Sequence, residues 1–146
     1  MSSIKVDVKE LDRLVVLLDQ YPNTVNTKVA KVVRTSTLNV ESYAKQKLTS
    51  NNSVDTGRLR NSINSKITMY EGIVSTNVKY ARYVEEGTKP HIIKPKNKKF
   101  LYWKGASHPV KQVKHPGGRA KPYMIPSFEK EVPNFMKELV NTVDLD

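Results

Sequence analysis

The sequence predicts an α+β fold with an N-terminal helical pair, an antiparallel sheet of hairpins, a short helix and a C-terminal helix. Apolar residues recur at helical spacing near both ends of the chain, and near its centre they alternate at strand spacing on both sides of a glycine. Helices and hairpins in this order favour an antiparallel sheet over a parallel one. The 146 residues suffice for one hydrophobic core, so we expect a single domain over residues 1–146.

A helical pair is predicted over residues 7–48. Asp7 and Glu10 are spaced as in a capping box, and apolar residues then recur every three or four positions. A tetrapeptide that contains Pro22 separates this segment from a longer second helix over residues 25–48. The apolar face of the second helix consists of Val25, Val29, Val32, Val33, Val40, Tyr43, Ala44 and Leu48.

Residues 54–86 predict a hairpin between two short helical segments. Asp55 or Thr56 is well placed to cap the first of these helices. Apolar residues alternate on both sides of Gly72, which we expect in the turn of an antiparallel hairpin with one buried face. The second short helix ends before Gly87, which stands where a C-cap glycine is expected.

Residues 87–125 are predicted to form a basic hairpin or loop. From Gly87 to Phe128 the chain has ten Lys or Arg residues and no Asp or Glu, so this segment holds +10 of the formal net charge of +11. The apolar runs 91–93 and 100–103 flank a lysine-rich stretch, which predicts a hairpin with a basic tip. Residues 106–122 show little periodicity and are expected to form a loop.

A final amphipathic helix is predicted over residues 126–143. Pro126 suits its first turn, and Pro133 is expected either to bend the helix or to mark its start. The apolar face of this helix consists of Phe128, Val132, Phe135, Met136, Leu139 and Val143.

The basic segment is expected to face an acidic partner, because ordinary surface loops mix the two signs of charge. Ammonium groups bind phosphates as point charges, and exposed aromatic rings stack on unpaired bases. For Phe100, Tyr102 and Trp103 we nevertheless favour burial in the core. The candidate partner- or DNA-facing residues are Lys89, Lys94, Lys96, Lys98, Lys99, Lys104, Lys111, Lys114, Arg119 and Lys121.

The sequence favours no enzymatic site. The absence of cysteine excludes disulfides and thiolate metal sites, and no segment approaches the ~20 apolar residues that cross a bilayer. Asp55 begins the tripeptide Asp-Thr-Gly found around aspartic-protease nucleophiles, but Arg58 and Arg60 follow it, so we favour helix capping. We expect no catalytic residue, no cofactor and no membrane partner.

The three histidines are candidates for a metal site or for acid–base catalysis. None of them has a second histidine or a carboxylate two to four residues away, and no acid lies in the segment to orient an imidazole. Structural or solvent-exposed roles are therefore favoured for His91, His108 and His115. No metal is expected.

Val54–Ile63 resembles the signature DTG-x-L-R-x-S-I of tail-component proteins of long-tailed bacteriophages. Three further stretches agree in order: residues 80–88 with YA-x-x-x-E-x-GT, residues 90–96 with PH-x-I-x-PK, and residues 113–128 with V-x-HPG followed by P-[FY]-[LM]-x-P-[AS]. The resemblance runs over nearly the whole chain. It assigns structural motif roles to Asp55, Thr56, Gly57, Leu59, Arg60, Tyr80, Glu86, Gly87, His91, Pro95, His115, Pro116 and Gly117.

The resemblance implies a structural neck protein that completes the tail and joins it to the DNA-filled head. Such proteins are not enzymes and assemble as a ring, most often of six subunits, through which DNA passes. The implied partners are further copies of the chain, neck or connector and tail-tube proteins, and phage DNA by non-specific contact. The protein would be made in the host cytoplasm and would end in the virion.

Two other functions remain open from the residues alone. The first is a nucleic-acid-binding protein that uses the basic segment 87–122 as its main site, with affinity that falls steeply as salt rises. The second, more distant, is a nuclease that depends on the three histidines.

Overall fold

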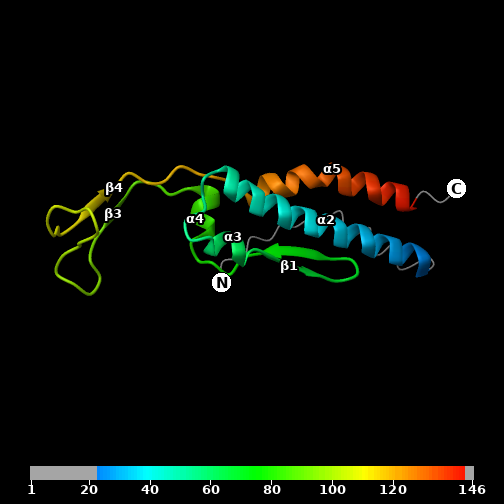
Figure 1. Ribbon diagram of the computed structural model, residues 1–146, viewed down its shortest axis with the longest axis horizontal. Helices are drawn as coiled ribbons and strands as arrows, with labels where there is room; N and C mark the ends of the chain where they lie inside the picture. The colour runs from blue at the N-terminus through cyan, green and yellow to red at the C-terminus, as the bar shows by residue number, and fades with distance from the viewer. Residues whose placement is uncertain (1–22, 144–146) are drawn as a thin grey trace.

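The computed structural model describes residues 23–143, which form a helical body and a long arm that projects from it (Figure 1). The element order confirms the predicted α+β class. The first predicted helix, from residue 7 to residue 18, lies outside the described residues. The elements are α2 (Asn23–Ser50), α3 (Arg58–Ser62), β1 (Asn64–Ile67), β2 (Gly72–Ser75), α4 (Ala81–Glu86), β3 (His91–Ile93), β4 (Val113–His115) and α5 (Met124–Val143).

The body is built on α2 and α5, which lie side by side and run in opposite directions (Figure 1). The predicted helix over residues 25–48 is confirmed as α2, which extends two residues further at each end. The last helix begins at Met124, two residues before the predicted start, so Pro126 occupies the third position. At that position a missing backbone N–H costs nothing, because the first N–H groups of a helix have no partner within it.

Two apolar clusters form the core along these helices, and buried polar residues lie between the clusters. The cluster near the start of α2 contains Val25, Val29, Val33 and Leu139. These polar residues include Thr37 and Glu131; Glu131 accepts a hydrogen bond from Asn39 Nδ2 at 3.0 Å. The second cluster joins α2, α3, α4 and the start of α5, and consists of Ala44, Leu48, Leu59, Ile63, Val78, Ala81, Tyr123 and Met124.

The hairpin β1–β2 packs on α2 and is antiparallel, as predicted. Its turn lies earlier than expected: Ile67 pairs with Gly72, and the Thr68 N–H donates to the Glu71 carbonyl at 2.8 Å. Gly72 is therefore the first residue of β2 and not a turn residue. A Cβ at this position would lie 1.7 Å from Thr37 Oγ1. The close approach of the strand to α2 is the reason for a glycine here.

The Ser65 hydroxyl fastens this hairpin to α2 by donating to Glu41 Oε2 at 2.6 Å. Partial burial by itself raises the pKa of the Glu41 carboxyl, but the hydrogen bonds from Lys45 and Ser65 outweigh it and lower that pKa below its ordinary value. The carboxylate therefore stays charged between two donors at the edge of the body.

Strand β3 pairs with β4, so the prediction that residues 91–93 pair with residues 100–103 is wrong. The register places His91 opposite His115 and Ile93 opposite Val113. The predicted loop over residues 106–122 thus contains a strand, which is too short to show periodicity. Within residues 23–143 the strands form two separate two-stranded sheets instead of one.

The ends of the short helices differ from the prediction at one place. Gly57, and not Asp55 or Thr56, is the N-cap of α3, with φ of +76° and no side-chain capping bond. The Thr56 hydroxyl accepts only a long bond of 3.4 Å from the Arg58 N–H. The predicted C-cap of α4 is confirmed at Gly87.

No helix within the described residues is both long enough and apolar enough to cross a membrane.

Candidate partner-binding arm and its root

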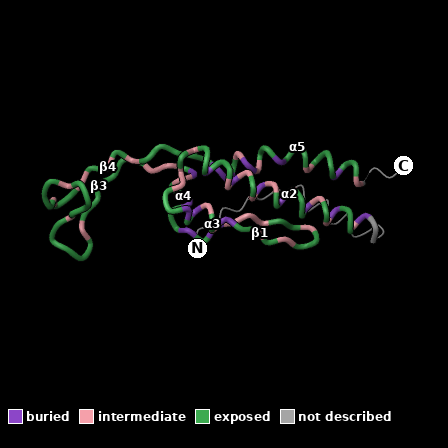
Figure 2. The backbone as a smooth tube through the Cα atoms, in the orientation of Figure 1, coloured by how far each residue is buried: buried purple, intermediate pink, exposed green. Residues whose placement is uncertain are grey.

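The arm comprises residues 88–118 and exposes nearly all of its surface (Figure 2). From residue 88 to residue 122, all of which the structure describes, no residue is buried. The ten predicted basic residues lie on the arm or just after it, and all ten are exposed. The structure thus gathers them on one projecting segment that carries no acidic side chain.

The aromatic residues of the arm are also exposed, so the prediction that they pack into the core is wrong. The exposed fractions are 46% for Phe100, 69% for Tyr102 and 50% for Trp103. They are apolar enough for a core position, but the arm projects from the body, and none of the buried residues that the structure describes lies on it (Figure 1). Exposed aromatic rings beside cations are typical of a binding surface and not of a solvated loop.

The far end of the arm is held by a second short pairing. Leu101 and Val110 exchange two backbone hydrogen bonds of 2.7 and 3.0 Å. Beyond them the Ala106 N–H donates to the Trp103 carbonyl at 3.0 Å and closes a turn. Tyr102 and Trp103 are therefore presented by a bonded turn.

The root of the arm is a close crossing of two backbone segments. Thr88 and Gly118 exchange two backbone hydrogen bonds of 2.9 and 3.0 Å. A Cβ on Gly87 would lie 2.6 Å from the Gly118 carbonyl oxygen, and one on Gly117 would lie 2.3 Å from the Thr88 carbonyl oxygen. Both glycines have positive φ, at +74° and +89°. The crossing therefore requires glycine at both positions.

Above the root, His91 and His115 stack with their ring centroids 5.0 Å apart. His91 Nδ1 lies 2.9 Å from the Lys89 carbonyl oxygen, whereas His115 Nδ1 accepts a bond from the Gly117 N–H at 3.1 Å. His108 lies elsewhere and bonds to Ser107. The described residues contain no group of three or more histidines or acids that could hold a metal ion.

The link between root and body depends on Glu85, a residue that the sequence analysis missed. Its carboxylate is buried and accepts three backbone N–H bonds at the start of α5: from Tyr123 at 2.8 Å, Met124 at 2.9 Å and Ile125 at 3.0 Å. A negative charge at this position also interacts favourably with the positive, N-terminal end of the dipole of α5. Glu85, through α4, thus caps a helix that begins 39 residues later.

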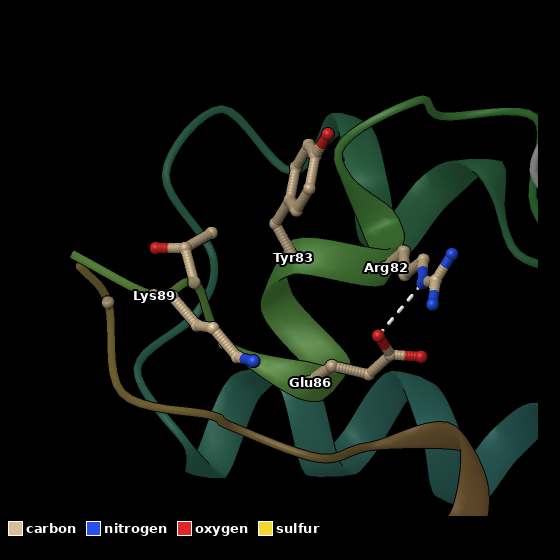
Figure 3. A pocket seen from close by; sticks show the side chains of 7 residues that line it. Arg82, Tyr83, Glu86 and Lys89 are labelled. Carbon is tan, nitrogen blue, oxygen red and sulfur yellow. Dashed lines mark hydrogen bonds and ion pairs between the residues drawn. The ribbon is translucent and has the colours of Figure 1, made fainter. Parts of the chain in front are cut away.

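Glu86, the acid that the sequence analysis selected, has a different environment. It is exposed and pairs with Arg82 one turn earlier, at 2.8 Å (Figure 3). The pair lines an open hollow of about 460 Å³ at the arm root, together with Tyr83, Thr88 and Lys89. The motif spacing YA-x-x-x-E-x-GT itself places the acid at residue 85, so the motif contained the signal that was overlooked.

The Asp-Thr-Gly motif lines a second hollow, of about 350 Å³, which Tyr80 also lines. Asp55 and Arg60 face it together with Tyr80, so two motifs that are 20 residues apart meet here. Leu59 also lines this hollow and is buried in the core cluster. The residues that line this hollow include no second carboxylate, which an aspartic-protease site needs.

The remaining motif residues, Pro95 and Pro116, lie on the arm beside its strands. Most of the motif residues therefore lie in or near α3, α4 and the arm root, whereas Pro95 lies further along the arm.

A family model described as "Bacteriophage HK97-gp10, putative tail-component" matches residues 9–87. No significant match was found among curated proteins or among solved structures. The matched region contains α2, α3, the β1–β2 hairpin, α4 and the motifs around residues 55–60 and 80–87, which is the body without α5. This chain belongs to the HK97-gp10-like tail-component family of bacteriophages.

Proposed function

We propose that this protein completes the phage tail and joins it to the head as one subunit of a ring, with six subunits as the expected number. The observation that carries the proposal is the family match over residues 9–87. The protein acts by assembly and not by catalysis. Its partners are copies of itself and the proteins of the neck, connector and tail tube.

The shape of the subunit supports assembly. Helix α5 carries an exposed apolar stripe, made of Ile125, Val132, Met136 and Val140, which borders its buried face. An apolar stripe on an outer helix is the kind of surface that a neighbouring subunit covers. A ring would bury this stripe between two copies of the chain, and the arms would extend from it toward neighbouring components.

The test is particle assembly in a phage that lacks this chain. We expect separate heads and separate tails to accumulate, and full-length protein supplied from a plasmid to restore joined particles. Normal infectious virions without the protein would rule out the proposal.

Two single substitutions on α5 refine the test. Met136→Glu places a charge on the apolar stripe and should prevent both ring formation and complementation, because a buried unpaired charge opposes association. Asn134→Glu, at an exposed position nearby on the same helix, is the matched control and should restore joined particles. Equal behaviour of the two variants would contradict the role of the stripe. Light scattering after size-exclusion chromatography measures the ring.

A further inference from the structure

The far end of the arm combines three properties that occur together nowhere else in the described chain: exposed aromatic rings, adjacent lysines and no acid. Tyr102 and Trp103 precede Lys104 directly, and Lys98 and Lys99 lie just before Phe100. The Leu101–Val110 pairing and the 103–106 turn order the backbone on both sides of Tyr102 and at Trp103. We propose that this end of the arm is a binding site for single-stranded nucleic acid, a role that goes beyond the joining function.

The type of cation points to phosphate. Nine of the ten basic residues between Gly87 and Phe128 are lysine. Lysine is depleted at protein–protein interfaces, whereas it pairs readily with phosphate oxygens as a point charge. A segment of 42 residues without a single acid also gives no opposite charge for a mixed protein surface to match. The charge of the arm is complementary to a phosphate backbone along its whole length.

The aromatic rings point to unpaired bases. Base pairs in a duplex are stacked on one another, so their faces are hidden, and the lysines alone would suffice to bind a duplex. Single strands offer free base faces that stack on tyrosine and tryptophan. With 69% and 50% of their surfaces exposed, Tyr102 and Trp103 have the free area that such stacking needs.

The chain contains its own reporter for this contact. Trp103 is its only tryptophan, and it lies at the proposed site. Stacking of a base on the indole ring should quench the fluorescence of the whole protein. The signal therefore arises from the site itself, in the unmodified full-length chain.

The experiment titrates the full-length protein with a short oligothymidylate and with a duplex of the same length, and follows both Trp103 fluorescence and oligonucleotide anisotropy. We expect quenching by the single strand and an affinity roughly tenfold or more above that for the duplex. Polyglutamate and anionic lipid vesicles at the same ionic strength should bind more weakly than the oligonucleotide.

Two variants separate stacking from charge. Tyr102→Ala should lower the single-strand affinity roughly tenfold and leave duplex binding unchanged, because it removes one stacking surface and retains Trp103. Replacing Lys98, Lys99 and Lys104 by Gln should weaken both and reduce the salt slope of single-strand binding by about 2. The matched controls are Tyr83→Ala and a change of Lys28, Lys31 and Lys47 to Gln, all exposed positions on the body.

Three outcomes would overturn the proposal. These are duplex binding as tight as single-strand binding without quenching, no loss of affinity in Tyr102→Ala, and stronger binding to polyglutamate or vesicles than to the oligonucleotide. Particle joining is measured separately. A failed oligonucleotide titration would therefore not contradict the joining function, and a failed assembly test would not contradict this binding site.

Discussion

Tyr123 is the largest side chain that the body buries completely, and its hydroxyl finds no hydrogen-bond partner among the described residues. Burial raises the pKa of the Tyr123 phenol well above its ordinary value, and the nearby Glu85 carboxylate raises it further. A buried hydroxyl without a partner stabilises little. Tyr123 therefore contributes to the core through its apolar ring and not through its hydroxyl group.

Replacing Tyr123 by Phe should leave the free energy of unfolding at pH 7 unchanged or raise it by about 1 kcal/mol, because an unsatisfied polar group is removed at constant shape. The unfolded chain loses the phenol proton near pH 10, while the folded chain keeps it, so wild-type stability falls above about pH 10. The variant should lose this fall, which is about 1.4 kcal/mol per pH unit.

Urea denaturation between pH 7 and pH 11 measures both effects. Tyr83→Phe, at an exposed position, is the control and should follow the wild-type curve. A Tyr123→Phe variant that is much less stable at pH 7, or that keeps the wild-type alkaline slope, would contradict the account.

At the scale of elements, the sequence predicts what neighbouring residues determine. Apolar spacing locates α2, α5 and the β1–β2 hairpin, because each shows its period over a continuous stretch. The pairing of β3 with β4 is different. It joins two three-residue strands separated by 19 residues, and segments of that length show no period. The same limit applies to the candidate site. The sequence predicts its basic residues, but it does not predict that the aromatic rings beside them are exposed, because exposure depends on where the fold places the arm.

Glu85 shows the same limit for a single contact between elements. Glu85 and Glu86 are adjacent in the sequence. Only the fold determines that Glu85 is buried against the start of α5, while Glu86 pairs with Arg82 on the surface. A motif marks the position of an acid but does not reveal which distant backbone groups it binds.

Glu85→Gln should lower the free energy of unfolding by about 2 kcal/mol, because the amide loses the charge and turns a donor toward one of the three backbone N–H groups. Glu86→Gln is the matched control on the same helix and should change the stability by less than about 0.5 kcal/mol, as expected for an exposed pair. Urea denaturation at pH 7 compares them. Equal losses in the two variants would disprove the capping role of Glu85.

At the scale of the whole molecule, the body and the arm have different physical natures. The body contains every residue that the structure describes as buried, whereas the arm is held by backbone pairing at its root, middle and far end (Figure 2). The stability of the body should therefore depend little on the arm. The buried residues lie in the body, but most of the net charge lies on the arm. Residues 89–117 carry eight lysines and no acid, which leaves +3 of the formal net charge of +11 for the rest of the chain.

This division predicts that the arm can be removed without unfolding the body. Thr88 and Gly118 are bonded to one another at the root, so a two-residue Asn-Gly turn can join them in place of residues 89–117. The shortened chain should keep its helical circular dichroism, and its free energy of unfolding should stay within about 1 kcal/mol of the full chain. It should also elute much earlier from a cation exchanger, because eight positive charges are gone.

Loss of helical signal in the shortened chain would show that the arm supports the fold and would refute the division. If the body folds, the same protein tests both uses of the arm. Loss of single-strand binding with normal ring formation would assign the arm to partners and the body to assembly. Loss of the ring as well would mean that the arms also hold neighbouring subunits together, and that the arm's cationic surface is partly enclosed in the assembled neck.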